Sequence, residues 1–274
     1  MKTVKYKHSG IAKKGKRPSS HFITPDLSAR DIVHVTSQIE RPANCPAVTV
    51  LICALNEEES LPFVLPKIPA WVDEILLVDG HSSDGSVALA KRLCPKLRVL
   101  FQPKKGKGDA LKYGVAQANG EIIVTLDADG ETPPEEIESF IQPLLDGNDF
   151  AKGSRLFKTR PRKLPPYRWF GNKILAFSCN ILYGTRFSDI CSGYNSFWKK
   201  AYLALDLTYA ENEIGCSMEQ QMIVKAKKAG MRITEVPHTS RGRIGGTSVL
   251  KNVKLSVNQG FRDWFVIVRE RFRG

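Results

Sequence analysis

From Pro46 onward, short apolar runs alternate with longer amphipathic segments, and this alternation constrains the fold more than any other feature. The apolar runs are typical of strands and lie at 48–55, 74–80, 97–102, 121–129 and 149–155. The segments between them predict helices at 57–68, 82–93, 108–118 and 133–145. Strands that alternate with helices pack as a mostly parallel sheet covered on both faces. We therefore predict an α/β domain.

Helix-start signals and a less regular second half complete the expected elements. The helix over 82–93 is expected to begin near Ser82 or Ser83. Thr132 as the N-cap, Pro133 at the first helical position and Glu135 two residues later form a capping-box pattern that opens the helix to Leu145. After Arg155, the pattern predicts helices at 169–182 and 218–229 and a strand at 231–237, with a polar-aromatic turn between the two helices.

Polar side chains follow several of the predicted strands at the point where each strand ends. They are Asn56, Glu57, Asp79, Asp127 and Asp129. Ligands of parallel sheets bind outside the carboxyl ends of the strands, so we expect these side chains to share one crevice. Asp127 and Asp129 can meet one hard cation, which takes oxygen ligands and often holds a diphosphate. The pattern suggests metal-assisted transfer from a nucleotide, and an acidic turn that merely closes a strand is the alternative.

The net charge of +13 is concentrated at the two ends of the chain. Residues 1–45 carry nine Lys and Arg against three acids, and residues 241–274 carry eight against two. Basic ends suit anionic lipid, a phosphate-bearing substrate or nucleic acid. Since no zinc-finger, RNP or helix-turn-helix signature occurs, we expect no nucleic-acid partner. Residues 1–45 are interpreted as a basic extension, disordered at least through Ser20.

Two further features bear on the location of the protein. No run of about 18 apolar residues predicts a transmembrane helix, and no apolar signal core follows the basic N-terminus. Six scattered cysteines without metal-ligand spacing indicate reduced, mostly buried thiols. We therefore expect a cytoplasmic protein.

The C-terminal segment, residues 249–274, predicts an amphipathic helix. Its apolar residues fall three or four apart and form one stripe: Leu250, Val253, Val257, Phe261, Trp264, Val268 and Phe272. Lysines and arginines lie largely off this stripe. The helix either packs on the domain or lies on a membrane surface. Packing is favoured, because such stripes usually face a core, and partial membrane contact stays open.

Eight segments follow one another in the order VTVLICALNEEESL, ILLVDGHSSDGS, KKGKGDALKYG, VTLDADGETPPEEI, AKGSR, SDICSGYNSF, MEQQM and EVPHTSRGRIGGTS. This order resembles family 2 glycosyltransferases of the GT-A fold, and most closely the polyprenyl-phosphate hexosyltransferases, to which the dolichol-phosphate mannose synthases belong. The match runs from about Val48 to Ser248. The resemblance implies a Rossmann-like catalytic domain over residues 46–248, with a mixed, mostly parallel sheet flanked by helices.

The resemblance also implies a site for a UDP- or GDP-sugar. The donor would contact Leu55, Asn56, Glu57, Asp79, Lys107, Gly108, Asp127, Ala128 and Asp129. The family often has a second aspartate where this chain has Gly80, so the base contact rests on Asp79 and the nucleotide stays open. Asp127 and Asp129 match the family's Asp-x-Asp and would hold Mg²⁺ or Mn²⁺ against the leaving diphosphate. Glu131 would complete the coordination.

The acceptor side of the site is implied by later residues. Arg155 offers a planar fork for phosphate oxygens, and the segment RGRIGGTS contributes Arg241, Arg243 and Ser248 to phosphate binding. Asp189 stands where many family members carry a catalytic acid. It would be the general base for a hydroxyl acceptor. For a phosphate acceptor, which is already an anion, it would orient the acceptor or a basic side chain.

Three hypotheses result. The first is an inverting, metal-dependent transferase that moves a hexose to a polyprenyl phosphate such as undecaprenyl or dolichyl phosphate. It would bind the cytoplasmic face of an anionic membrane peripherally and reversibly by salt. The second is a soluble transferase that acts on a small-molecule or glycan hydroxyl. The third is a nucleotide-sugar-binding protein without turnover. Catalysis in the first two would rest on Asp129, Arg155 and Asp189.

Overall fold

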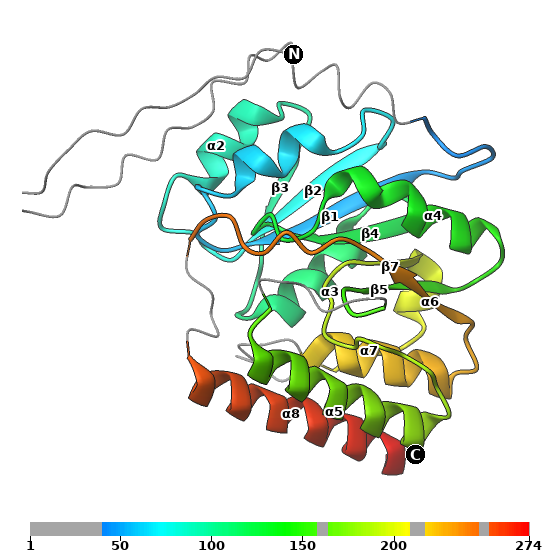
Figure 1. Ribbon diagram of the computed structural model, residues 1–274. Coiled ribbons are helices and arrows are strands. Elements are labelled where there is room, and N and C mark those ends of the chain that lie inside the picture. The colour runs from blue at the N-terminus through cyan, green and yellow to red at the C-terminus, as the bar shows by residue number, and fades with distance from the viewer. Residues whose placement is uncertain (1–39, 158–163, 209–216, 247–251, 274) are drawn as a thin grey trace, which may run out of the picture.

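The computed structural model describes residues 40–157, 164–208, 217–246 and 252–273 (Figure 1). The expected disorder through Ser20 and the predicted phosphate contact of Ser248 lie outside these residues. Within them, seven strands form one sheet in the order β3-β2-β1-β4-β6-β5-β7. The strands are β1 (Val48–Ala54), β2 (Glu74–Asp79), β3 (Arg98–Phe101), β4 (Ile122–Asp127), β5 (Phe150–Ser154), β6 (Asn195–Trp198) and β7 (Ile233–Pro237).

Only β6 runs antiparallel to its neighbours β4 and β5, whereas the other strand pairs are parallel. The predicted mixed, mostly parallel sheet is therefore confirmed. The helices are α2 (Ser86–Leu93), α3 (Lys107–Gln117), α4 (Ile137–Leu145), α5 (Pro166–Tyr183), α6 (Lys199–Leu203), α7 (Ser217–Lys228) and α8 (Val253–Phe272). The shortest is α6, which follows β6 directly.

Both faces of the sheet are covered, as predicted. Side chains alternate along a strand, so Leu51 of β1 packs among residues of α3, α5 and α7. Its neighbours Val50 and Ile52 point to the opposite face and pack among residues of α2 and α4. Figure 1 shows α5 and α8 side by side at the lower edge of the molecule, beyond α7. The carboxyl ends of β1 and β4 therefore open toward a space that α5 and α8 border.

Two predicted helices take a different form. Residues 57–68 form two short 3₁₀ turns, Leu61–Phe63 and Leu65–Lys67, because the prolines at 62 and 66 remove N–H donors and interrupt an α-helix. The capping box at Thr132 does not form either. The hydroxyl of Thr132 is buried without a hydrogen-bond partner among the described residues. A 3₁₀ turn over Pro134–Glu136 instead precedes α4.

Other boundaries shift for local reasons. The helix expected from Ser82 begins at Ser86, because the Ser82 hydroxyl donates to Asp79 Oδ1 at 2.5 Å and closes the loop after β2. The segment interpreted as a polar-aromatic turn contains β6, and α6 follows it. All five described cysteines are free, but only Cys179 is buried and the others are partly exposed.

The face by which α8 packs on the domain corrects the sequence prediction. The buried residues of α8 are Gln259, Asp263, Val266, Ile267 and Glu270. The predicted apolar stripe lies on the opposite side, where Phe261 is 68% and Phe272 81% exposed. The helix thus docks through a largely polar face whose groups have partners. Asp263 accepts from Ser217 Oγ at 2.8 Å and Glu270 from Gln221 Nε2 at 3.1 Å.

Candidate active site

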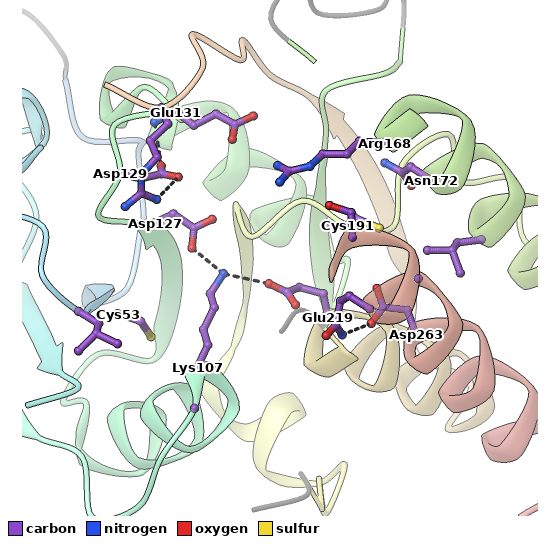
Figure 2. A pocket seen from close by; sticks show the side chains of 18 of the residues that line it. Cys53, Lys107, Asp127, Asp129, Glu131, Arg168, Asn172, Cys191, Glu219 and Asp263 are labelled. Carbon is purple, nitrogen blue, oxygen red and sulfur yellow. Dashed lines mark hydrogen bonds and ion pairs between the residues drawn. The ribbon is translucent and has the colours of Figure 1, made fainter. Parts of the chain in front are cut away.

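A cavity of roughly 1400 Å³ opens at the carboxyl ends of β1 and β4 (Figure 2). Among the predicted donor residues, those that line it are Leu55, Glu57, Lys107, Asp127, Ala128 and Asp129. Arg155, Glu131 and Arg243 line it as well. The volume exceeds the 300–1,000 Å³ usual for small-molecule pockets, so the cavity has room for more than one ligand.

Lys107 stands at the centre of this cavity and binds two acids. Its Nζ lies 2.5 Å from Asp127 Oδ1 and 3.0 Å from Glu219 Oε1 (Figure 2). Burial alone would raise the pKa of Asp127, but the ammonium of Lys107, with the more distant charges of Arg155 and Arg243, outweighs it and lowers the pKa. Burial raises the pKa of Glu219, and Lys107 opposes that shift. A Cβ at Gly193 would come within 2.8 Å of the Lys107 nitrogen, so glycine allows this close approach.

Asp129 differs from Asp127 in its electrostatics. Burial, strengthened by the neighbouring charge of Asp127, raises the pKa of Asp129 to about 6. Its Oδ2 lies 3.3 Å from Nη1 of Arg243, which also pairs with Glu57. The segment that carries Arg243 is held over the site because the N–H of Ile244 donates to the Asp129 carbonyl at 3.0 Å. This segment places one of the two predicted arginines at the acidic pair.

The acidic pair fits a hard divalent cation that arrives with a phosphate ligand. In the part of the chain that the structure describes, no three His, Cys, Asp or Glu side chains are placed to hold one metal ion. Glu131 lines the same cavity, and its Oε1 accepts from Ser240 Oγ at 2.7 Å. Its predicted part in the coordination stays a prediction. Asp127 and Asp129 supply the one or two carboxylates with which Mg²⁺ sites are typically built, the remaining ligands being water and substrate phosphate. Their mutual repulsion, visible in the pKa of Asp129, favours a cation.

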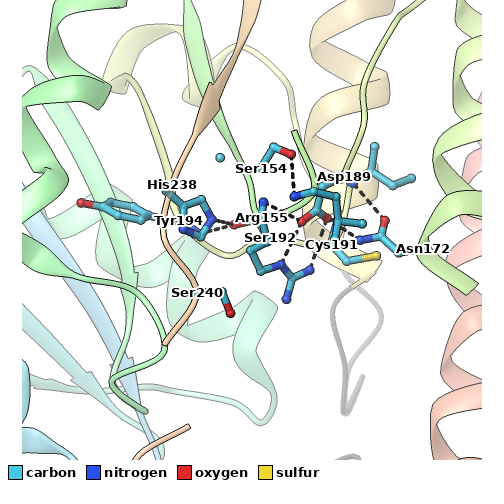
Figure 3. A network of polar contacts seen from close by, with 12 residues as sticks. Ser154, Arg155, Asn172, Asp189, Cys191, Ser192, Tyr194, His238 and Ser240 are labelled. Atoms are coloured by element: carbon cyan, nitrogen blue, oxygen red, sulfur yellow. Dashed lines mark hydrogen bonds and ion pairs between the residues drawn. The ribbon is translucent and has the colours of Figure 1, made fainter. Parts of the chain in front are cut away.

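Arg155 and Asp189 form a buried ion pair beside the cavity (Figure 3). Arg155 Nε donates to Asp189 Oδ2 at 2.8 Å and Nη2 to Oδ1 at 3.2 Å. Asp189 has no exposed surface and also accepts from Asn172 Nδ2 at 2.6 Å. Burial would raise the pKa of Asp189, but the charges of Arg155 and Lys152, together with hydrogen bonds from Arg155 and Asn172, outweigh it and hold this pKa well below its usual range. Arg155 lines the cavity, whereas Asp189 lies behind it.

Several predicted residues lie near the cavity without lining it. Asp79 is buried, and its carboxylate accepts from the N–H and hydroxyl of Ser82 at 2.8 and 2.5 Å. Asn56 has a left-handed backbone, and its side chain accepts from the N–H of Ser83 at 2.8 Å. Arg241 pairs with Glu135 at 3.4 Å and is 42% exposed. Gly108 is buried in the first turn of α3.

Sequence reasoning missed the far end of the cavity. That end is lined by residues of α5 and α8, among them Arg168, Asn172, Asp263 and Trp264 (Figure 2). Long connections separate α5 from the end of β5 and α8 from the end of β7, so the rule that locates ligand sites at strand ends does not reach these helices. The one sequence signal for this end of the cavity was the apolar stripe of α8, which we predicted to pack on the domain.

Comparisons with known proteins agree with this geometry. The family model described as "Glycosyl transferase family 2" matches residues 49–205, more than half of the chain. Glycosyltransferase AglJ of Haloferax volcanii is 31% identical over 206 residues, which are 73% of this chain and 65% of that protein. The dolichol-phosphate mannosyltransferase of Pyrococcus furiosus is 30% identical over 214 residues, 74% of this chain and 59% of that protein. The matches thus span less than two thirds of both relatives.

Among solved structures, the glucosyl-3-phosphoglycerate synthase of Mycobacterium tuberculosis in complex with Mn²⁺, UDP and phosphoglyceric acid superimposes with a TM-score of 0.65. It is 18% identical, and the alignment covers 91% of this chain and 84% of that one. At this identity the likeness establishes the fold alone. That fold is the GT-A fold. The chain belongs to glycosyltransferase family 2 and is a glycosyltransferase.

No helix within the described ranges combines the length and the apolar character needed to cross a bilayer.

Proposed function

We propose that the protein transfers a hexose from a UDP- or GDP-sugar to a polyprenyl phosphate at a membrane surface, with Mg²⁺ or Mn²⁺ as cofactor. One observation carries this proposal. The cavity that contains Asp127 and Asp129 continues between α5 and α8 to apolar side chains such as Phe170 and Phe261, which are 61% and 68% exposed. An acceptor with a phosphate head and a hydrocarbon tail matches a cavity that is charged at one end and apolar at the other.

The donor is assigned to the charged end of the cavity. Asp127 and Asp129 would hold the metal ion, which supplies positive charge to the diphosphate that leaves. Lys107 pairs with both Asp127 and Glu219, and it begins α3, whose N-terminal N–H groups favour an anion. Leu55, 51% exposed in the same cavity, offers an apolar surface for the base or ribose.

The acceptor phosphate would meet the donor between the two arginines that line the cavity, Arg155 and Arg243. A phosphate oxygen attacks the anomeric carbon as the bond from that carbon to the diphosphate oxygen breaks, which inverts the configuration. The nucleophile is an anion at neutral pH, so no strong base is needed. Asp189, fully buried with a lowered pKa, suits the second of its two predicted roles: it positions Arg155.

The outer surfaces of α5 and α8 support a membrane location. Phe177 and Ile181 of α5 are both 65% exposed, and Phe265 and Phe272 of α8 are 59% and 81% exposed. Large apolar patches of this kind on a protein surface mark an interaction site. Arg262, Arg269 and Arg271 lie on the same helix, Arg273 follows its last residue, and all four are exposed. An apolar face with basic side chains beside it suits the interface of an anionic bilayer.

The relatives are consistent with this acceptor class. One of them is named a dolichol-phosphate mannosyltransferase, and a second protein of Haloferax volcanii, a dolichyl-phosphate hexose transferase, is 27% identical over 205 residues. The alternative, a soluble transferase that uses Asp189 as the base for a hydroxyl acceptor, predicts a different result in the experiment below.

The test is a transfer assay with radiolabelled UDP- and GDP-sugars, each with Mn²⁺ or with EDTA. Undecaprenyl phosphate in anionic vesicles is the acceptor. A melting-shift screen of the same sugars first selects the donor, since a ligand of the folded state raises the melting temperature. We expect label in the lipid phase, dependent on Mn²⁺, and flotation of the protein with the vesicles at low salt. Absence of lipid-linked product with every donor would refute the proposal.

A further inference from the structure

The two helices at the outer end of the cavity are joined at one end and separated by the cavity at the other. Towards their C-termini, the hydroxyl of Tyr183 in α5 donates to the carbonyl of Ile267 in α8 at 2.7 Å. Towards their N-termini, both helices line the cavity instead. The lining side chains there include Tyr167, Phe170 and Ile174 of α5 and Val257, Phe261 and Trp264 of α8. The N-terminal turns of the two helices thus form the walls of a groove that is largely apolar and also contains Arg168 and Asn172 of α5 and Asp263 of α8.

Each wall contains a glycine in the interior of its helix. Gly171 of α5 and Gly260 of α8 both line the cavity. A helix-interior glycine is less favourable than alanine because its backbone has more freedom to lose on folding. Such a glycine therefore needs a local reason, either close packing or a functional demand for space.

Packing does not explain these two glycines. A Cβ added at Gly171 or at Gly260 would meet no atom of the described residues within 4 Å. Gly114 in α3 is the contrast: a Cβ there would come within 2.6 Å of Leu51 and 2.8 Å of Val78. Gly114 is required by the contact between α3 and the sheet. Gly171 and Gly260 instead widen the groove. Each helix thus contains a glycine that is unfavourable for helix formation at a position that lines the same cavity.

We propose that this groove is the binding site for the hydrocarbon chain of the acceptor, with its first isoprene units lying against Gly171 and Gly260. The inference rests on the proposed function and adds a subsite to it. The chain would leave the phosphate at Arg155, pass between α5 and α8, and emerge among the exposed side chains of Phe170 and Phe261. Branched, unsaturated units are wider than a straight alkyl chain, which explains why both walls lack a side chain at this point.

The groove differs from the charged part of the cavity in a way that fits such a ligand. Its walls present aromatic and aliphatic side chains beside Arg168 and Asn172 of α5, and two buried polar side chains of α8, Gln259 and Asp263, already have partners. Gln259 Nε2 donates to Ser217 Oγ at 3.0 Å and to Asp263 Oδ1 at 2.7 Å. A hydrocarbon chain can therefore cover the apolar surface without leaving Gln259 or Asp263 without a hydrogen bond. Continuity with the donor pocket favours an acceptor lipid over a second copy of the chain as the occupant.

The test fills the groove by substitution at the two glycines. Gly260→Leu and Gly171→Leu place a side chain where the isoprene units would lie. Displacing two methylene groups from apolar contact weakens binding about fifteenfold, so we expect the KM for undecaprenyl phosphate to rise by about that factor. The KM for the nucleotide sugar, measured in the same assay, serves as the internal reference. Asn258→Leu is the matched control, because Asn258 is exposed on α8 and does not line the cavity.

Gly260→Ala keeps the test interpretable if a leucine impairs folding. Alanine has open space at this position and is the better helix former, so the melting temperature should rise while the KM for the lipid also rises. A merely structural glycine would not combine these two effects.

The outcomes separate the inference from the function on which it rests. If the wild-type protein transfers no sugar to undecaprenyl phosphate, the proposed function fails and the subsite fails with it. If the wild-type protein is active and the glycine variants leave the KM for the lipid unchanged, the subsite alone is wrong. A stable dimer in sedimentation that Phe261→Ser dissociates, together with an unchanged KM for the lipid, would assign the groove to a second copy and overturn the inference.

Discussion

Replacement of Asp189 by asparagine distinguishes a general base from a residue that positions Arg155. The two oxygens of Asp189 accept from Arg155, from Asn172 and from the N–H of Cys191, the last at 2.8 Å. The substitution keeps the size of the side chain but replaces one acceptor oxygen by an N–H₂ group. Arg155, whose side chain is only 14% exposed, then keeps its charge with only the more distant carboxylate of Glu131, at 3.6 Å, as an acidic partner. We therefore expect Asp189→Asn to act first on stability.

The size of this effect follows from the burial of the pair. Removing one partner of a buried ion pair typically costs about 3–5 kcal/mol. For a chain of this size, each kcal/mol lowers the melting temperature by roughly 2–4 °C, so the expected loss is about 6–20 °C. Arg155→Gln should cost a similar amount. The double variant should cost much less than the sum of the two, because both changes break the same pair.

The contribution of Asp189 to stability also depends on pH. Arg155, with Lys152 and Asn172, overrides the effect of burial and lowers the pKa of Asp189 below the value of about 3.9 expected in the unfolded chain. The ionised carboxylate therefore stabilises the fold at every pH above about 4, and this contribution is lost as the pH falls towards the folded pKa. Melting curves of wild type and Asp189→Asn should differ by a constant amount between about pH 5 and 8 and converge in more acidic buffer. An unchanged melting temperature with a hundredfold loss of kcat, on the order expected for a proton-transfer residue, would refute the positioning role.

Three further predictions concern the other parts of the molecule. Asp129→Asn should lower kcat for transfer by about 10²–10³ with no loss of melting temperature, since it relieves repulsion from Asp127, and unchanged transfer would contradict a metal site there. Combining Phe177→Ser with Phe261→Ser should weaken binding to anionic vesicles at least tenfold, because each buried phenylalanine contributes about 1.5–3 kcal/mol. Flotation checks this, and equal binding would place the membrane contact elsewhere. Gly114→Ala should destabilise the fold by about 1–3 kcal/mol in urea titrations, as its Cβ would overlap Leu51, and a stabilised variant would be inconsistent with that packing.

The fold was predictable where its signals are local. The strands β1 to β5 are apolar runs of four to seven residues with helices between them, and their period and order predict the parallel sheet. The strand β6 was missed because its four residues pair with β4 and β5, which lie far away in the sequence. The two 3₁₀ turns within 57–68 replaced a helix because prolines at 62 and 66 outweigh the apolar spacing.

The site was predictable where it lies at strand ends. Asp127, Asp129 and Glu57 gather at one edge of the sheet, as the rule for parallel sheets requires. The partners that set their charge state come from distant segments. Lys107 joins Asp127 to Glu219 of α7, more than a hundred residues later, and Arg243 reaches back to Asp129. Such pairings depend on tertiary packing, so a single sequence cannot assign them.

The apolar stripe of the C-terminal helix was predicted to face the domain, but the opposite face of the helix packs there. The stripe through Phe261 and Trp264 satisfies every criterion for a core-facing surface, yet these side chains are 68% and 43% exposed. The opposite face docks because its polar groups, Gln259 and Asp263, meet Ser217 of α7 at hydrogen-bonding distance. A helix that contacts its own domain through satisfied polar groups keeps its whole apolar face available. That face borders the cavity that holds the acidic pair, so the proposal assigns two roles to one helix: contact with a bilayer, and one wall of the groove for the acceptor.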